Sequence, residues 1–184
     1  MGKLYEEITP ELATWIKRQP LFFVATAPLS TDGHLNTSPK GLDCFLIASP
    51  RQVAYLDMTG SGAETIAHLR ENGRIVLMFC AFGGPPKIVR LHGRGMVVTR
   101  RSPDWRVWLD RFPNLSAPRS VIVVDVTRVS DSCGYGVPKL KFTSDREALT
   151  RRADKKGAEA LPAYRVAKNT RSIDGLSALE ERNA

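Results

Sequence analysis

Segments that favour β-strands follow one another closely through the middle of this chain. Two of them, RIVLMFCAF at 74–82 and SVIVVDVTRVSD at 120–131, are rich in Val, Ile and Phe, which are enriched in strands. Because the links are short and helices do not alternate regularly with the strands, the order predicts an antiparallel barrel rather than a doubly wound parallel sheet. The remaining strand candidates are LFFVAT, HLNTS, CFLIAS, QVAYLD and KIVRLHGRGMVVTR, at 21–26, 34–38, 44–49, 52–57 and 87–100.

The KIVRLHGRGMVVTR segment carries two further signals. Gly93 and Gly95 predict a bulge or a sharp bend, which barrel strands require. On a period of two, Arg90, His92 and Arg94 share one face of the strand. These side chains either face solvent or, for the two arginines, reach a ligand.

Helices are predicted at the margins of the strand series. TPELATWIK has Thr9 as its N-cap and Pro10 in the first helical position. SPDWRVWLDRF, at 102–112, predicts a second short helix. SDREALTRRADKKGAEA, at 144–160, predicts a basic helix capped by its first serine, and the polar remainder at 161–184 is predicted to be irregular.

The composition is that of an ordinary globular chain with a strong positive charge. Its 184 residues suit one domain, and a hydrophobic content of 42% is enough for one sizeable core. The formal net charge of +8 favours anionic partners such as a phosphorylated ligand. The basic run at 151–156 lacks an aromatic stacking platform, so nucleic acid is not the expected partner. The three histidines show no zinc spacing, and no metal site is predicted.

A cytoplasmic location is expected. Cys44, Cys80 and Cys133 are odd in number and widely spaced, which is typical of reduced thiols rather than a disulfide framework. The N-terminal MGKLYEEITPEL lacks the apolar core of a signal peptide. No run approaches the ~18 apolar residues that a membrane span needs, so no membrane association is expected.

The turn TGSGAET, at 59–65, allows two interpretations. Ser61 and Glu64 have the spacing of a capping box, and Asn72-Gly73 suits the end of the helix that follows. The same turn gathers hydroxyls, backbone donors and a helix N-terminus, which together suit a phosphate. It lacks the Gly-Lys-Ser/Thr ending of a Walker loop and the third glycine of the dinucleotide fingerprint.

Several motifs together resemble the pyridoxamine 5'-phosphate oxidase-like family of FMN-binding split barrels. They are NTSPKG at 36–41, VAYLDMTGSGAETIAHLRENGRIVLMF at 53–79, KIVRLHGRG at 87–95 and CGYGVP at 133–138. The tail KNTRSIDGL, at 168–176, is similar to a C-terminal signature of one branch of that superfamily.

The resemblance implies a mainly β fold, a six-stranded antiparallel Greek-key split barrel with short helices. It also implies a homodimer with FMN in clefts at the subunit interface. Residues 1–138 would form the FMN-binding domain. Residues 139–184 would form a C-terminal helix and tail that pack on the same domain or on the dimer partner.

The resemblance also carries cofactor contacts onto this sequence. The phosphate-gripping Ser-Arg-Lys triplet of the oxidase falls on Ala63, Glu64 and Thr65, so an acid stands where an arginine is expected. The phosphate would then be bound by hydroxyls and backbone N–H groups of the turn, or by Arg90 or Arg94. The cofactor-binding positions implied are Ser38, Pro39, Lys40, Gly41, Thr59, Gly60, Ser61, Glu64, Thr65, Arg90 and Tyr135.

The function predicted is that of an FMN-dependent oxidoreductase acting on a small cytosolic substrate. Residues that hold the substrate in pyridoxamine 5'-phosphate oxidase have no match in the tail, so that reaction is not predicted, and no catalytic residue is assigned. Asn169, Ser172 and Asp174 would line the substrate side if the tail folds over the cleft. Alternatives are a non-catalytic FMN storage or sensing module, or a relative that binds deazaflavin or haem. Lys87, at a strand start, is expected in solvent.

Overall fold

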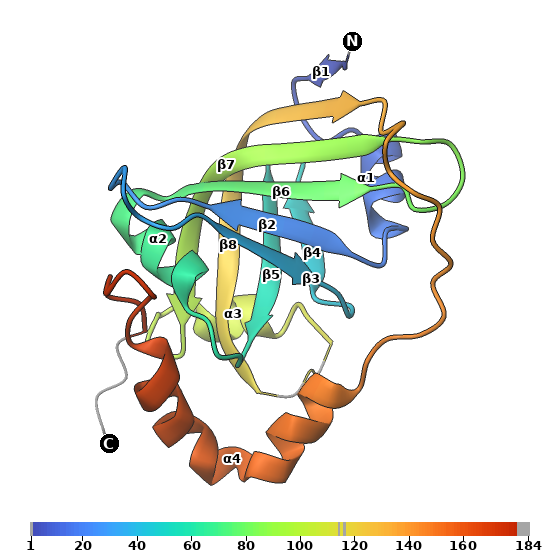
Figure 1. Ribbon diagram of the computed structural model, residues 1–184. Helices are drawn as coiled ribbons and strands as arrows, with labels where there is room; N and C mark the ends of the chain where they lie inside the picture. The colour runs from blue at the N-terminus through green and yellow to red at the C-terminus, as the bar shows by residue number, and fades with distance from the viewer. Residues whose placement is uncertain (1, 114, 116, 180–184) are drawn as a thin grey trace.

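The computed structural model describes residues 2–113, 115 and 117–179, which form one antiparallel sheet flanked by helices (Figure 1). The sheet has eight strands in the order β3-β2-β6-β7-β8-β5-β4, with β1 paired to β8. The elements are β1 (Leu4–Tyr5), α1 (Pro10–Lys17), β2 (Phe22–Thr26), β3 (Asn36–Lys40), β4 (Phe45–Ser49), β5 (Gln52–Met58), α2 (Glu64–Asn72), β6 (Arg74–Cys80), β7 (Ile88–Thr99), α3 (Trp105–Leu109), β8 (Pro118–Ser132) and α4 (Ala148–Asn169).

The predicted fold class is confirmed, with a difference in strand number. The sheet is open and antiparallel throughout, consistent with a split barrel, but it contains eight strands instead of six. One addition is the two-residue β1. Strand β5 pairs with β8 only as far as Asp125, and β1 pairs further along β8, at Val129 and Ser130.

The bend that Gly93 and Gly95 predicted is present in β7. The β7–β8 register shifts between His92 and Gly93. A Cβ on Gly93 would lie 2.3 Å from the Asp125 carbonyl oxygen, and one on Gly95 would lie 2.7 Å from Leu69 Cδ2. The absence of a side chain at Gly93 therefore allows β8 to lie close to β7, and its absence at Gly95 allows α2 to pack against β7.

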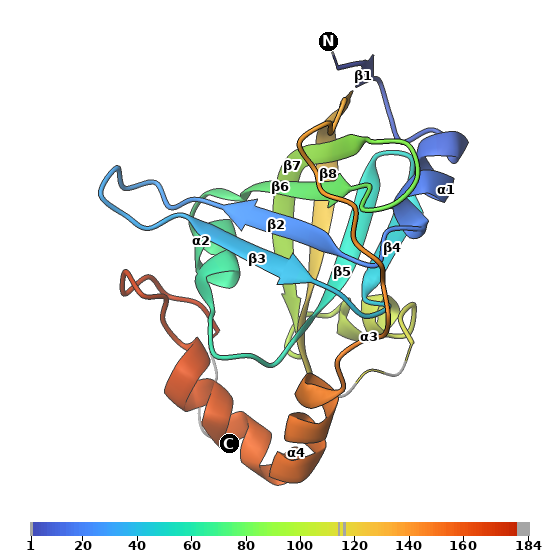
Figure 2. The ribbon, with the colours of Figure 1, turned by 45° about the vertical axis from the view of Figure 1, so that its right-hand side comes forward.

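The helices lie at different sides of the sheet. Helix α2 packs on β2, β6 and β7, whereas α1 lies near one end of the sheet and α4 crosses below the other end in both views (Figures 1 and 2). Helix α1 is capped as predicted, because Thr9 Oγ1 accepts a hydrogen bond from Leu12 N at 3.2 Å. None of the helices in the described residues is long and apolar enough to cross a lipid bilayer.

The C-terminal helix differs from its prediction at both ends. It begins at Ala148, and Ser144 does not cap it. It continues to Asn169, through residues predicted to be irregular, with a kink at Gly157 where φ is 73°. The buried positions in its last turns, Arg165 and Asn169, have helical spacing but polar side chains, so a search for hydrophobic periodicity does not find them. Residues 180–184 of the predicted tail lie outside the described residues.

Candidate functional site

A cleft of about 1330 Å³ lies beside β3, between the loop that joins β5 to α2 and the segment that leads to α4. Its walls come from the end of α1, the β3–β4 turn, the β6–β7 loop and residues 140–149. Seven of the sequence-predicted cofactor residues line it: Ser38, Pro39, Lys40, Gly41, Gly60, Glu64 and Thr65.

The other four predicted residues do not line the cleft of this chain. Thr59 is buried and donates its hydroxyl to the Ala117 carbonyl. Ser61 is exposed beside the cleft. Arg90 lies on β7, where its guanidinium donates to Ser132 Oγ at 3.0 Å, and Tyr135 is 82% exposed.

The sequence predicted that Lys87 faces solvent, but the structure places it on the wall of the cleft. Its side chain is 28% exposed and lines the cleft, and its Nζ lies 3.4 Å from Asp131 Oδ2. The same ammonium lies 5.7 Å from the ring centroid of Trp15. The chain returns from the β6–β7 loop towards α1, which brings Lys87 to this wall.

A buried carboxylate, Asp57 at the end of β5, organises the cations on the cleft wall. Lys40 Nζ lies 3.0 Å from its Oδ1, and Arg119 Nε lies 2.6 Å from its Oδ2. Ser120 Oγ adds a third donor at 3.2 Å. Burial by itself would raise the pKa of Asp57, but the charges and hydrogen bonds of Arg119 and Lys40 outweigh it and hold the pKa well below its usual range. The group therefore stays ionised, and one net positive charge remains on the three side chains.

Arg119 also holds the β5–α2 loop, defined here as residues 59–63. Its Nη1 donates to the Gly62 carbonyl at 2.6 Å and to the Gly60 carbonyl at 3.3 Å. Burial opposes the charge of Arg119, but Asp57 raises its pKa above the ordinary value. The guanidinium is thus committed to the protein, and Lys40, with a side chain 21% exposed, is the more accessible cation of the pair.

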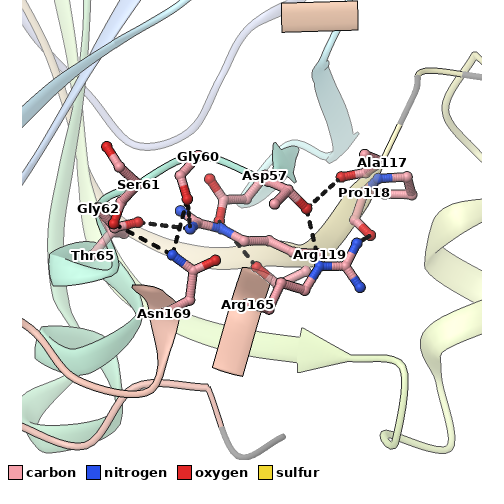
Figure 3. Close-up of polar contacts among 12 residues, drawn as sticks. Asp57, Gly60, Ser61, Gly62, Thr65, Ala117, Pro118, Arg119, Arg165 and Asn169 are labelled. Atoms are coloured by element: carbon pink, nitrogen blue, oxygen red, sulfur yellow. Dashed lines mark hydrogen bonds and ion pairs between the residues drawn. The ribbon is translucent and has the colours of Figure 1, made fainter. Parts of the chain in front are cut away.

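Helix α4 contributes two further side chains that bind the same loop (Figure 3). Asn169 Nδ2 donates to the Gly60 carbonyl at 2.9 Å and to the Ser61 carbonyl at 3.5 Å. Arg165 donates to Thr59 Oγ1 at 3.0 Å and to the Pro118 carbonyl at 3.1 Å. The tail therefore packs against the loop, and Asn169 does not line the cleft, although the sequence had suggested that it would. The same holds for Ser172 and for Asp174, which pairs with His34 on the surface.

The capping box predicted at Ser61 and Glu64 is wrong. Helix α2 begins at Glu64, its N-cap is Ala63, and no side chain caps it. The reason lies outside the segment, because the loop carbonyls bind Arg119 and Asn169 and hold residues 60–62 away from helical geometry. The predicted stop at Gly73 is confirmed, with φ at 68° and its N–H bound to the Leu69 carbonyl.

The loop consequently presents unused backbone donors. Within a trans peptide the C=O and N–H groups point in opposite directions, and the described chain has no cis bond. Since the carbonyls of Gly60, Ser61 and Gly62 point towards Asn169 or Arg119, the N–H groups of residues 61, 62 and 63 point away from them. No described residue accepts a hydrogen bond from these three N–H groups.

A chain of polar side chains leads from the cleft to a buried histidine. Asn36 Nδ2 donates to Thr65 Oγ1 at 2.9 Å and lies 3.4 Å from Thr26 Oγ1. Thr26 Oγ1 lies 2.9 Å from Nδ1 of His68, whose pKa burial holds below its ordinary value. Ser38 Oγ donates to Asn36 Oδ1. The Thr65 hydroxyl accepts the hydrogen bond from Asn36 and keeps its own proton, which it can donate to Tyr55 or into the cleft.

Three residues that shape the site were missed by the sequence reading, Asp57, Arg119 and Arg165, and Asn169 was given a different role. A charged residue at the end of an apolar strand was the available signal for Asp57 and Arg119. Arg165 and Asn169 lie in a polar tail, more than 100 positions along the chain from the loop that they bind. No local pattern identifies such contacts.

Comparisons with known proteins agree on the family. A family model described as pyridoxamine 5'-phosphate oxidase matches residues 8–133. A pyridoxamine 5'-phosphate oxidase family protein of Aspergillus flavus, ustO, is 43% identical over 196 residues, covering 97% of this chain and 78% of the relative.

Solved structures share the fold at low identity. HupZ from Group A Streptococcus gives a TM-score of 0.52 at 22% identity, covering 66% of this chain and 91% of that chain. The FAD binding protein from Mycobacterium smegmatis gives 0.50 at 16% identity, covering 71% and 96%. The match over 8–133, together with a relative aligned along nearly the whole sequence, shows that this chain belongs to the pyridoxamine 5'-phosphate oxidase family.

Proposed function

We propose that this protein binds FMN in the cleft beside β3, with the flavin phosphate at the β5–α2 loop. One observation carries the proposal: the unused N–H groups of residues 61–63 lie on a loop whose Gly60 and Gly62 line a cationic cleft, next to Lys40 and Thr65. Backbone donors at a helix N-terminus favour anions, and phosphate is the anion that family membership suggests.

The charge of the cleft suits an anionic ligand. Among the described residues, six cationic side chains and two carboxylates line it. The cations are Arg18, Lys40, Lys87, Arg119, Lys141 and Arg146, and the carboxylates are Glu64 and Asp145. Such an excess attracts a phosphorylated cofactor and raises its local concentration.

The side chains near the loop fit a phosphate in detail, with one exception. The ammonium of Lys40 donates to Asp57 and retains further N–H donors, and the Thr65 hydroxyl has a proton to donate. Glu64 opposes a dianion, and no hydrogen bond or ion pair to a described residue neutralises it. Neutral backbone donors together with one lysine would therefore replace the arginine of the oxidase.

The remaining walls suit a flat, largely apolar ring. Trp15, Leu42, Met58, Phe82 and Pro86 line the cleft. Ligand sites of this kind combine apolar walls with a few polar groups that fix orientation. A bound flavin would supply hydride-transfer chemistry, while the protein supplies binding, orientation and electrostatics.

Flavin suits the cleft better than haem does. Most haem proteins use an imidazole or a thiolate as an axial ligand. None of the three histidines lines the cleft. Cys44 does, but burial raises the pKa of its thiol to about 12, so it is not a thiolate at neutral pH.

The finer parts of the proposal concern catalysis and assembly. We infer a cytoplasmic oxidoreductase for a small substrate other than pyridoxamine 5'-phosphate, in a domain comprising residues 1–138 with the C-terminal segment packed on it. We also infer a homodimer with FMN at the interface. In support, Leu140 and Phe142 line the cleft while 60% and 56% exposed. A second copy would cover them and bring further residues to the cleft.

The test is a titration of the purified protein with FMN, followed by flavin fluorescence and by the absorption spectrum. We expect saturable binding with one FMN per chain at micromolar protein. Absence of saturable binding would contradict the proposal. Oxidation of NAD(P)H by the loaded protein would then separate an oxidoreductase from a storage or sensing module, and light scattering would report the oligomeric state.

A further inference from the structure

We propose that helix α4 contributes to ligand binding through Asn169 and Arg165, which act as positioning residues for the β5–α2 loop. They orient the loop so that its N–H groups are presented to the phosphate, and docking of α4 is thereby coupled to phosphate binding. The identity of the ligand rests on the proposed function.

The side chains of α4 bind the loop at three consecutive residues, and Arg165 also donates to the Pro118 carbonyl at the start of β8. Asn169 is fully buried, and its amide nitrogen donates to the carbonyls of Gly60 and Ser61 (Figure 3). Arg165, 3% exposed, donates to Thr59 Oγ1 at the start of the loop. Successive turns of one helix therefore hold three consecutive residues of the loop.

The loop does not impose this conformation on itself. Gly60 and Gly62 lack side chains, which leaves the peptide planes between them free to rotate in an unsupported chain. Neither glycine has a positive φ that would restrict the choice. The external donors on Asn169 and Arg119 thus determine which way the loop carbonyls point, and with them the N–H groups of residues 61–63.

The side chain of Asn169 carries a free-energy penalty that a purely structural role does not explain. Its Oδ1 is buried and has no hydrogen-bond partner among the described residues. An apolar side chain of similar size would fill the space without an unpaired oxygen. What the amide adds is the pair of hydrogen bonds to the loop, and these control the face that the loop presents to the cleft.

Coupling of this kind is reciprocal. If docking of α4 raises the affinity of the loop for phosphate, then phosphate must stabilise the docking of α4 by the same factor. If a residue served only the stability of the fold, its substitution would lower the unfolding temperature. It would change the affinities for a phosphorylated ligand and for the same ligand without phosphate to the same extent.

The experiment compares FMN with riboflavin, which lacks the phosphate, in Asn169→Ala and in a matched control, Asn72→Ala. Asn72 also lies at the end of a helix and donates Nδ2 to a carbonyl, that of Ala27 at 2.8 Å, at the far end of α2. We expect Asn169→Ala to weaken FMN binding about tenfold and to leave riboflavin binding unchanged. The control should change neither affinity.

A second pair of variants covers the case in which Asn169→Ala does not fold. Arg165→Lys is compared with Arg74→Lys, because Arg74 likewise donates to a carbonyl, that of Pro28 at 3.0 Å. Only the first should show a loss that is specific to FMN.

Direct observation of the loop completes the test. Inorganic phosphate is titrated into ¹⁵N-labelled wild type, and the amide shifts of residues 61–63 are followed. The proposal is overturned if these amides do not respond, if FMN and riboflavin bind wild type equally, or if the α4 variants lose both flavins alike. Should wild type bind neither flavin, the proposed function fails, and this inference is then decided by whether inorganic phosphate shifts the amides of residues 61–63 more in wild type than in Asn169→Ala.

Discussion

Asp57 and Arg119 form a buried ion pair at the inner wall of the cleft, with 2.6 Å between Oδ2 and Nε. Both residues are almost fully enclosed, at 2% and 7% exposure. The same guanidinium binds the carbonyls of Gly60 and Gly62, so the pair connects the end of β5 to the loop that follows it. The electrostatics of the core and the shape of the ligand site therefore depend on one carboxylate.

Asp57→Asn should lower the free energy of unfolding by about 3–5 kcal/mol, because it leaves the buried Arg119 guanidinium, and also Lys40, without a counter-charge. Urea denaturation measures the difference. Asp125→Asn is the control, since Asp125 accepts an exposed hydrogen bond from Gln52 and should cost less than about 1 kcal/mol. Similar losses for the two variants would show that the pair contributes little.

Stability should fall in acid, and Asp57 should account for part of the fall. The folded-state pKa of Asp57 is depressed below its value in the unfolded chain, which is about 3.9. Its contribution is therefore complete above that unfolded value and is lost as the pH falls below it, towards the folded pKa. Unfolding free energies measured from neutral pH down into this range should decline less steeply for Asp57→Asn than for wild type. Parallel curves would exclude Asp57 as a source of the decline.

Lys40→Ala should weaken FMN binding about ten- to hundredfold, through loss of a charge-assisted hydrogen bond worth roughly 1.5–3 kcal/mol. Lys17 is the matched control, because it is exposed in the last turn of α1 and does not line the cleft. Lys87 does not serve, since it also lines the cleft. Titrations at two salt concentrations separate a local contact from long-range electrostatic attraction. Equal FMN affinities for the two variants would show that the phosphate does not bind next to β3.

Glu64→Gln should tighten FMN binding about three- to tenfold, because it removes a negative charge near the proposed phosphate while keeping the shape of the side chain. Asp145→Asn is the control, as a second carboxylate that lines the cleft on the segment leading to α4. Riboflavin should bind the Glu64 variant and wild type alike. Weaker FMN binding by Glu64→Gln would indicate that the carboxylate accepts a hydrogen bond from the ligand.

Gly93→Ala should destabilise the protein by about 1–3 kcal/mol or more, since the new methyl group would overlap the backbone of β8. Gly136→Ala is the control, because a Cβ there meets no atom within 4 Å and its φ is not positive. Thermal unfolding of the two variants provides the comparison. Equal unfolding temperatures would mean that β8 yields at the bulge without cost.

The strand series and the first helix could be predicted from the sequence because each depends on neighbours along the chain. Alternation of apolar residues and β-branched content predicted β2 and β4 to β8, and Thr9-Pro10 predicted the start of α1. Strand β3 was expected only as a short extended piece that ends at Pro39, but it continues to Lys40. Gly93 marked the bulge, since the absence of a side chain is itself a local property. The motifs that surround the cleft, NTSPKG and TGSGAET, were likewise visible as short segments.

Tertiary structure decided what those segments do. Ser61 and Glu64 have the spacing of a capping box, but hydrogen bonds from Arg119 and Asn169 to the loop carbonyls outweigh the local preference, and the helix begins without a side-chain cap. The partners of Asp57 come from β3 and β8, and those of Thr59 and Gly60 come from α4. The sequence by itself therefore determined most of the elements, apart from β1 and the last turns of α4, and the positions of the candidate ligand-binding segments. Which of their polar groups are satisfied internally, and which are left for a ligand, depended on side chains far away in the chain, because hydrogen bonds form between atoms that folding brings together in space.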